Sequence, residues 1–245
     1  MTEFKAGKYG KESEYSYAFG FFPVFELLKY RPGEVLRVVL SSKAKASGGA
    51  EKLSGICAAK NIRISTDDKL LSRISPKENV FAAGIFRKYS SPIQKSGAQL
   101  VLNCPENAGN LGTIIRTMIG FNSCDIALIR PAVDIFDPAC VRASMGGLFQ
   151  VNFSYFDSFE GYLREHPKRN IYLFMTSGEK SVREAEFVKP CSLVFGSESS
   201  GLPEEFRKHG RSVYIPQSDR IDSLNISVAA GIGLYEAAKN FTENE

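Results

Sequence analysis

Three short segments of the sequence combine glycines with polar side chains, and each one follows a run of apolar residues. They are PENAGNLGTIIR (105–116), FGSESSGLP (195–203) and IPQSDRIDSLN (215–225). Ligands of open α/β sheets bind outside the carboxyl ends of the strands, so we expect the three loops to converge on one site. Taken singly, each loop is also what any strand-to-helix turn of a parallel sheet requires. The polar side chains that these loops contribute are Asn110, Arg116, Glu198, Ser223 and Asn225.

Several common catalytic motifs are absent from the sequence. The dinucleotide pattern G-x-G-x-x-G, the P-loop and the G-x-S-x-G nucleophile elbow do not occur, and Gly109 and Gly112 have the wrong spacing for the first of them. Arg130 follows the next expected strand, where a ribose-binding carboxylate would be needed. Hydride transfer, P-loop chemistry and serine hydrolysis are therefore excluded. The five cysteines form no C-x-x-C pair and only two histidines are present, so we expect no metal site.

Two of the polar positions allow more than one interpretation. Arg116 lies on an expected helix among apolar neighbours, where it would pair with Glu198, extend to solvent, or hold a phosphate or ribose with its planar guanidinium. The segment Ser223-Leu224-Asn225 precedes the last expected helix, so Ser223 or Asn225 would cap that helix as well as bind a ligand. Capping and ligand binding do not exclude each other.

The elements that position these loops follow from hydrophobic periodicity. The first half of the chain predicts a small α/β unit, with helices from Phe25 and over 49–61 and 66–75, and strands over 35–41, 62–65 and 79–89. The second half alternates strands with helices, which predicts an α/β fold with a parallel sheet. Its expected strands are 98–104, 125–130, 170–177, 192–197 and 212–216, and its expected helices are 111–121, 137–149, 160–166, 202–210 and 223–241.

Charge divides the chain where composition predicts a linker. Residues 1–97 contain 17 Lys and Arg against 9 Asp and Glu, whereas residues 98–245 contain 14 against 18. We expect a flexible arm over 1–14, a small α/β domain over 15–90, a linker of composition SSPIQKSG, and a second domain over 98–245. The basic first half suggests that it meets a polyanion.

The rest of the composition bounds the location of the protein. No apolar stretch approaches the roughly 20 residues of a membrane span, and the amino-terminal residues MTEFKAGKYGKE contain no apolar core of a signal peptide. The odd number of cysteines argues against a disulfide scaffold. We expect a cytoplasmic protein with no membrane contact.

Three motifs together resemble those of the SpoU/TrmH family of knotted (SPOUT) RNA ribose 2′-O-methyltransferases. They are N-x-G-x-x-x-R-T at 110–117, LVFGSESSGL at 193–202, and I-P followed eight residues later by L-N-I-S at 215–227. The segment DPACVRASMGGLF (137–149) also resembles the family, and residues 15–89 resemble its small ribosomal-protein-like substrate-binding domain more weakly. This resemblance implies that the small α/β domain over 15–90 is an RNA-binding domain. Gln217 departs from the pattern, since members usually carry Met after Ile-Pro.

The resemblance implies a fold and a cofactor. Members of this family form a parallel-sheet α/β knot, a deep trefoil knot in which the C-terminal segment passes through a loop. They bind S-adenosyl-L-methionine between the second and third motifs, and often form homodimers. By this resemblance the backbone of five residues would surround the cofactor: Thr176, Gly196, Gly201, Ile215 and Leu224.

The resemblance also implies the reaction, which is methyl transfer to a ribose 2′-hydroxyl of ribosomal or transfer RNA without a metal. Arg116 would accept the proton or position the ribose and its phosphate. Asn110 would orient Arg116 or the ribose, Glu198 would anchor its loop, and Ser223 with Asn225 would fix cofactor and ribose. Two alternatives stay open: a non-catalytic RNA-binding or ribosome-assembly protein on the same fold, and methylation of a base. The last helix, with Ile232, Leu234 and Tyr235, offers an apolar face either for a second copy or for packing within the chain.

Overall fold

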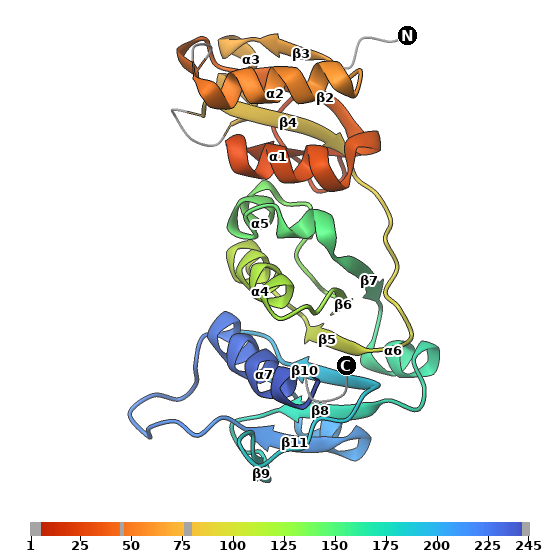
Figure 1. Cartoon of the computed structure of the whole chain (residues 1–245). Coiled ribbons are helices and arrows are strands. Elements are labelled where there is room, and N and C mark those ends of the chain that lie inside the picture. Colours follow the sequence, from red (N-terminus) through yellow and green to blue (C-terminus); the bar gives the residue numbers. More distant parts are fainter. Residues whose placement is uncertain (1–5, 45–46, 76–79, 242–245) are drawn as a thin grey trace. The chain divides into compact units, whose positions relative to one another are not determined.

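The structure, a computed structural model, describes residues 6–44, 47–75 and 80–241 (Figure 1). The chain divides into two compact units. The N-terminal unit combines residues 1–89 with 134–150, and the second unit combines residues 90–133 with 151–245. Each unit contains its own sheet.

The sheet of the N-terminal unit has four strands in the order β1-β4-β2-β3. The central strand β4 is antiparallel to β1 and β2, and β3 pairs with β2 in parallel. The strands are β1 (Tyr15–Phe19), β2 (Val35–Leu40), β3 (Ile64–Thr66) and β4 (Ala82–Arg87). The helices are α1 (Phe21–Tyr30), α2 (Gly48–Ala59) and α3 (Asp68–Ile74), with short 3-10 helices η1 (Pro32–Glu34) and η2 (Ser42–Ala44). The sequence analysis predicts all of these strands except β1.

Both faces of this sheet are buried. On one face α3 contributes Leu70, Leu71 and Ile74 to a cluster with Tyr17 and Val39. On the other face α1 packs closely over β4, because a Cβ atom at Gly84 would lie 2.7 Å from Cδ2 of Leu27. Glycine at this position lets the helix approach the strand, and a larger residue would force the two apart.

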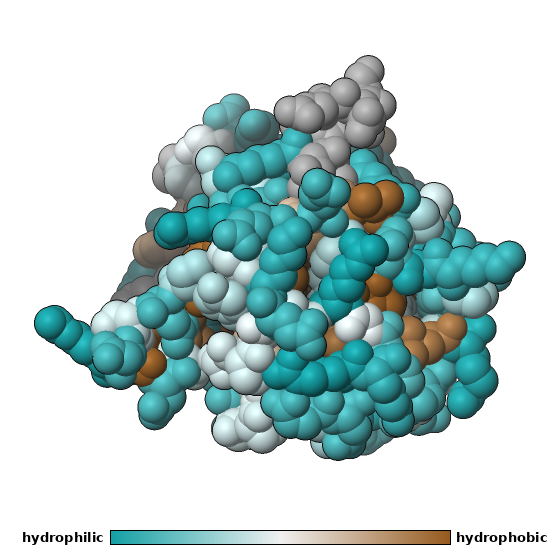
Figure 2. Space-filling view, turned by 90° about the horizontal axis from the view of Figure 1, so that it is seen from below, coloured by the Kyte–Doolittle hydropathy of each residue, from teal (hydrophilic) through white to brown (hydrophobic). Residues whose placement is uncertain are grey.

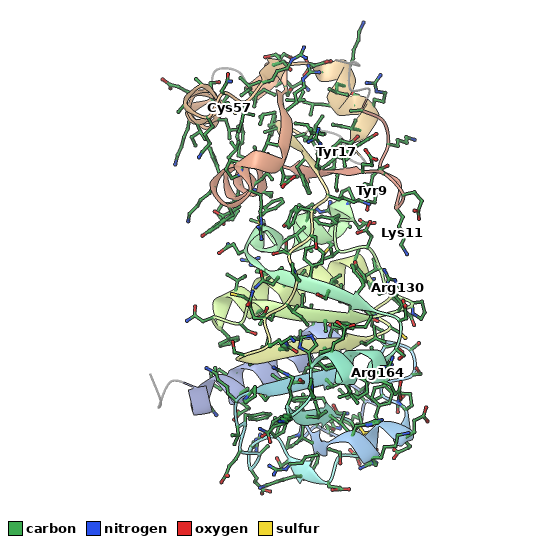
Figure 3. All side chains as sticks on the ribbon, turned by 90° about the vertical axis from the view of Figure 1, so that its right-hand side faces the viewer. Tyr9, Lys11, Tyr17, Cys57, Arg130 and Arg164 are labelled. Carbon is green, nitrogen blue, oxygen red and sulfur yellow. The ribbon has the colours of Figure 1, made fainter. Side chains whose placement is uncertain are left out.

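Residues 6–11, which the sequence assigns to a flexible arm, make specific contacts with the N-terminal unit. Ala6 is buried, and the hydroxyl of Tyr17 donates to the carbonyl of Gly7. The hydroxyl of Tyr9 donates to Asp134, and Nζ of Lys88 donates to the carbonyl of Lys11 at 2.6 Å. Figure 3 shows Tyr9, Lys11 and Tyr17 in the same part of this unit. The structure thus differs from the expectation over these residues, whereas residues 1–5 lie outside the described ranges.

The segment 134–150 packs with the N-terminal unit, although the sequence places it within the domain over 98–245. It contains α5 (Pro138–Ala143) and the 3-10 helix η3 (Gly147–Gln150). The buried hydroxyl of Ser16 donates to the carbonyl of Phe136 at 2.5 Å, and the rings of Phe136 and Phe149 both pack on Phe86. These aromatic and polar contacts are made by residues distant in sequence, which explains why the composition of the chain gave no sign of them.

The sheet of the second unit is parallel throughout, as the alternation of elements predicts. Its seven strands have the order β7-β6-β5-β10-β8-β11-β9, and each neighbouring pair is parallel. The strands are β5 (Ala98–Asn103), β6 (Asp125–Ile129), β7 (Asn152–Phe156), β8 (Asn170–Phe174), β9 (Lys180–Ser181), β10 (Cys191–Phe195) and β11 (Arg211–Tyr214). The helices are α4 (Ala108–Gly120), α6 (Phe159–Glu165), the 3-10 helix η4 (Glu204–His209) and α7 (Ile226–Phe241).

Helices cover both faces of this sheet, so its central strands are continuous apolar runs. On one face α6 and η4 supply Phe159, Tyr162 and Phe206 to a core cluster with Val101 and Val194. On the other face α4 and α7 pack against each other, and α7 lies over β10 (Figure 1). A Cβ atom at Gly233 of α7 would lie 2.7 Å from the ring of Phe174, so α7 approaches the strands as closely as a helix can.

The segment 90–97, which has the composition of a linker, is held to the second unit by hydrogen bonds. The backbone N–H of Gln94 donates to Asp125 at 2.7 Å, and the hydroxyl of Ser91 donates to Asn152 at 2.9 Å. Arg169 donates to the carbonyls of Lys95 and Gly97, both at 2.8 Å. These bonds fix the segment as part of the unit.

A chain of buried polar groups continues from Arg169 at the amino ends of the strands. Nε of Arg169 donates to Oγ of Ser192 at 2.8 Å, and that hydroxyl lies 2.6 Å from the hydroxyl of Tyr162. Tyr162 donates to Oε1 of Gln99 at 2.5 Å, and Nε2 of Gln99 lies 3.3 Å from Nδ1 of His166. Burial, aided by the positive charge of Arg169, lowers the pKa of His166 below its ordinary value. We call these five residues the buried chain.

The surface of the second unit near β9 and β11 is mainly hydrophilic, with small separate hydrophobic areas (Figure 2). The edge strand β9 is only two residues long, and a short polar edge resists pairing with another sheet. Among the described residues, none of the helices is both long enough and apolar enough to cross a membrane.

Candidate functional site

A large pocket opens at the carboxyl ends of β8, β10 and β11, where the sequence predicts a site. Its volume is about 860 Å³, and the three motif loops all contribute to its walls. Phe174 and Phe195 at the ends of β8 and β10 stack with ring centroids 4.2 Å apart beside it. The acidic residues Glu198, Glu204 and Asp222 also line the pocket. The lining therefore combines aromatic and acidic residues.

The second motif loop turns back on itself through two glycines. A Cβ atom at Gly196 would lie 1.9 Å from the backbone of Gly201, so only glycine fits there. Gly201 adopts φ +67°, a left-handed conformation that favours glycine, and its missing side chain would point into open space. The loop therefore depends on glycine at both positions to make its turn.

Glu198 connects the second motif loop to the first. Its Oε1 accepts from Nδ2 of Asn110 at 3.1 Å, and its Oε2 accepts from the backbone N–H of Glu106 at 3.1 Å. A further bond joins the same loops, since the hydroxyl of Ser199 donates to Glu106 at 2.9 Å. Glu198 thus uses one oxygen for each contact, and it faces Asn110 rather than Arg116.

Asn225 connects the third motif loop to the first. Its Nδ2 donates to Oδ1 of Asn110 at 3.2 Å. Its own Oδ1 accepts from the backbone N–H of Ser227 at 2.8 Å and from the hydroxyl of Ser227 at 2.6 Å. The first of these two bonds caps α7, as one interpretation of the sequence expects. We call Ser227, Asn225, Asn110 and Glu198 the amide relay.

Arg116 does not join this cluster within one chain. Its side chain is exposed, and no hydrogen bond or ion pair links it to any residue in the described ranges. It lies six residues beyond Asn110 on α4, about 9 Å along the helix axis at 1.5 Å per residue. The pairing of Arg116 with Glu198 that the sequence left open is therefore not present.

The five residues expected to surround a cofactor, from Thr176 to Leu224, all line the pocket. Ser223 also lines it and is exposed. Gln217, where the family usually carries Met, lines the pocket and donates to the carbonyl of Asp222 at 3.2 Å, which ties the third motif loop together. The convergence that the sequence predicts is thus present for every assigned residue except Arg116.

The sequence analysis overlooked a group of residues at the rim of the pocket. Arg207 donates from Nη2 to the carbonyl and hydroxyl of Ser177, at 2.7 and 2.9 Å, and pairs with Glu204 at 2.5 Å. Hydrogen bonds from Arg207 and Ser177 lower the pKa of Glu204. Ser177 and Glu204 line the pocket. Ser177 follows β8 closely and Glu204 follows the second motif, and these positions in the sequence could have indicated that both residues lie at the pocket.

A comparison with protein families matches residues 97–235 to the SpoU rRNA Methylase family. An uncharacterized tRNA/rRNA methyltransferase of Synechocystis is 30% identical over 70% of this chain. A 23S rRNA (adenosine(1067)-2′-O)-methyltransferase of Streptomyces laurentii is 32% identical over 59% of it. The chain spans 64% of the first relative and 55% of the second.

Solved structures extend the likeness to nearly the whole chain. An rRNA methyltransferase from Sinorhizobium meliloti, solved with AdoMet bound, is 27% identical with a TM-score of 0.77, covering 93% of this chain and 88% of that one. The SpoU methyltransferase AviRb from Streptomyces viridochromogenes, 20% identical with a TM-score of 0.79, covers 94% and 91% and shows the same fold. The family match covers more than half of the chain and includes all three motif loops of the pocket. The chain therefore belongs to the SpoU rRNA Methylase family.

Proposed function

We propose that this protein is an S-adenosylmethionine-dependent RNA methyltransferase that methylates a ribose 2′-hydroxyl of ribosomal or transfer RNA. The observation that carries the proposal is the meeting of all three motif loops in one pocket, with Asn110, Glu198 and Asn225 joined by hydrogen bonds. The names of the relatives support it, since one describes a 2′-O-methyltransferase of 23S rRNA and another a tRNA/rRNA methyltransferase.

The pocket fits S-adenosylmethionine. Its volume of about 860 Å³ lies in the range of small-molecule sites. Gly196 and Gly201 both line it, and the missing side chain of Gly201 would point into open space, which leaves room for a ligand close to the backbone. Thr176, Ile215 and Leu224 line the pocket together with other residues of the same loops. The carboxylates at the rim complement a cofactor that carries a sulfonium and an ammonium group.

Bound S-adenosylmethionine would supply an electrophilic methyl group and leave as a neutral thioether, while the protein orients the ribose oxygen and its proton passes to solvent water. Asn110 and Asn225 lie at the pocket wall with amide N–H groups that can hold the oxygen. A guanidinium is effectively always protonated, so we assign Arg116 to binding the ribose or its phosphate rather than to accepting the proton. Glu198 holds Asn110 in place, and Ser223 would contact cofactor or ribose.

Arg116 does not line the pocket of its own chain, although the resemblance assigns it a role there. It lies on the exposed side of α4, and its guanidinium is unpaired among the described residues. Val228 and Tyr235 of the adjoining helix α7 are 49% and 53% exposed, although Leu234 packs within the chain. We therefore propose a homodimer that packs through α4 and α7 and brings Arg116 of one protomer to the pocket of its partner.

We also propose that the second unit is knotted. The strand β11 lies near one edge of the sheet, and the third motif loop follows it in the sequence. This loop leads to α7, which packs on α4 and on β10 near the middle of the sheet. That return path supports a C-terminal segment that threads the loops beside β10. The hydrogen bond from Asn225 to Asn110 ties the segment to the first motif.

The basic N-terminal unit, which contains the small domain predicted over 15–90 up to Tyr89 and the further segment 134–150, would hold the RNA. Lys60, Arg63 and Lys69 are exposed on it. Replacing all three with alanine should weaken RNA binding and flatten its dependence on salt concentration. We also propose a cytoplasmic location, as the sequence predicts.

Incubation of the purified protein with RNA and methyl-labelled S-adenosylmethionine tests the proposal. Label should enter RNA and survive alkaline hydrolysis as a dinucleotide, because a methylated 2′-oxygen cannot attack the adjacent phosphate. Label in single nucleotides would indicate base methylation. RNA binding without any label would indicate the non-catalytic alternative.

A further inference from the structure

The direction of every hydrogen bond in the amide relay is fixed from both ends. The ionised carboxylate of Glu198 only accepts, so Asn110 must turn its NH₂ group toward it. The carbonyl oxygen of Asn110 then faces Asn225, which must donate a hydrogen bond to it from its own NH₂ group. At the far end the backbone N–H of Ser227 only donates, so it requires the oxygen of Asn225. The two ends impose the same orientation on both amides.

The hydroxyl of Ser227 adds a bond that the helix cap does not need. Capping of α7 is accomplished by the backbone N–H of Ser227, 2.8 Å from Oδ1 of Asn225. The hydroxyl donates to the same oxygen at 2.6 Å, the shortest bond of the relay. Ser227 is half-buried in the first turn of α7 and does not line the pocket. Its hydroxyl therefore acts on the pocket only through Asn225.

We propose that Ser227 is a positioning residue for methyl transfer, which locks the amide of Asn225 and through it the amide of Asn110. The proposal rests on the proposed function, because it concerns the same pocket. With the relay locked, Asn110 and Asn225 each retain one unused N–H, and neither needs to turn its oxygen toward a ligand. The relay thus presents donors to the ribose oxygen and cannot itself remove the proton.

Kinetics of Ser227→Ala test this role. We expect kcat to fall about five- to tenfold, the size of one net hydrogen bond, with the KM for RNA and the Kd of S-adenosylmethionine within about twofold of wild type. Ser227→Thr, which keeps the hydroxyl, should restore kcat. The matched control is Ser72→Ala, since the Ser72 hydroxyl donates to the carbonyl of Asp68 at 2.9 Å on the exposed side of α3 in the N-terminal unit. An unchanged kcat in Ser227→Ala, or a Thr variant as slow as Ala, would overturn the proposal.

A double mutant tests whether Ser227 acts through Asn225 or contacts the substrate directly. In an Asn225→Ala background, Ser227→Ala should lower kcat no further, because the group through which it acts is gone. A further loss of similar size would show that Ser227 touches the substrate itself, against the proposal.

A spectroscopic measurement on the free protein keeps this inference distinct from the proposed function. With ¹⁵N-labelled asparagine, Ser227→Ala should shift the side-chain NH₂ resonances of both Asn225 and Asn110, whereas Ser72→Ala should shift neither. A shift at Asn225 alone would refute transmission along the relay even in an active enzyme. Shifts at both, in a protein that transfers no methyl group, would retain the relay and refute the proposed function.

Discussion

Two chains of directed hydrogen bonds lie at opposite ends of the strands β5 and β10 in the same unit. The buried chain, from Arg169 to His166, lies at the amino ends, and its members find their partners inside the protein. The amide relay lies at the carboxyl ends beside a pocket, and Asn110 and Asn225 retain unused N–H groups there. The same kinds of side chain thus serve stability where they are satisfied and solvent is excluded, and ligand binding where donors are left over.

The largest expected effect comes from Arg116, which belongs neither to the buried chain nor to the amide relay. Arg116→Ala should lower methyl transfer by about 100-fold or more through lost orientation of ribose or phosphate, with cofactor affinity nearly unchanged. Arg116→Lys should be almost as slow, since a point charge does not reproduce a planar fork. Single-turnover rates and cofactor calorimetry measure both quantities.

Circular dichroism should show that both Arg116 variants fold as wild type does, because the side chain has no partner within the described part of one chain. Mixing inactive Arg116→Ala with inactive Asn110→Ala should recover part of the activity if the two residues act from different protomers. No recovery after exchange of protomers would contradict the proposed dimer.

The next effect should appear in both activity and stability. Asn225→Ala removes the helix cap of α7 together with a member of the relay. We expect a loss of about 1 kcal/mol in the free energy of unfolding from the cap and a fall of about 10- to 100-fold in kcat from the misplaced amide of Asn110. Denaturant titration measures the free energy of unfolding, and steady-state kinetics on the same preparation measure kcat. A variant with wild-type kcat would remove the relay from the mechanism.

A change in the buried chain should lower stability and leave activity unchanged. Tyr162→Phe leaves the oxygen of Gln99 without its donor in a fully buried position, which should lower the free energy of unfolding by about 1 to 3 kcal/mol. Activity per folded molecule should stay at the wild-type level at 20 °C, because the change lies at the far ends of the strands. Active-site titration with labelled cofactor corrects kcat for any unfolded fraction. A large drop in the corrected kcat would mean that the buried chain and the amide relay are energetically coupled.

The smallest effect concerns pH. The pKa of His166 is lowered in the folded state by burial and by Arg169, so the unfolded chain takes up this proton first as pH falls. Stability should be full above the ordinary histidine pKa of about 6.5 and should decline below it, until the folded state is protonated as well. Glu165, Lys95 and Asp125 also act on this group. His166→Gln should show a smaller decrease in thermal midpoint between pH 7 and pH 5.

The pattern of the sequence was sufficient to predict the parallel sheet and the convergence of the three loops. Runs such as LVF and strand-helix alternation depend on local composition, which explains why β5, β6, β8, β10 and β11 were expected near their observed positions. The strands β1, β7 and β9 were not predicted. All three lie at sheet edges, β1 and β7 are only five residues long, and β9 has two residues.

What could not be predicted depends on contacts between residues distant in the chain. The packing of 134–150 with the N-terminal unit rests on Phe136 and Phe149 meeting Phe86, and no local signal marks that choice. The same holds for the site, where residue types indicated that Glu198 would anchor a loop but not that it would select Asn110 over Arg116. Deleting residues 1–90 would consequently expose the apolar side of 134–150, so point variants are better tests than truncation.

The most direct test of the central claim is a map of 2′-O-methyl groups in total RNA from cells with the gene, without it, and with Arg116→Ala in its place. The account predicts one or more ribose positions that are methylated only with the wild-type gene and that stay unmethylated with the variant. An identical map in all three strains, or a missing base methylation in place of a ribose one, would contradict it.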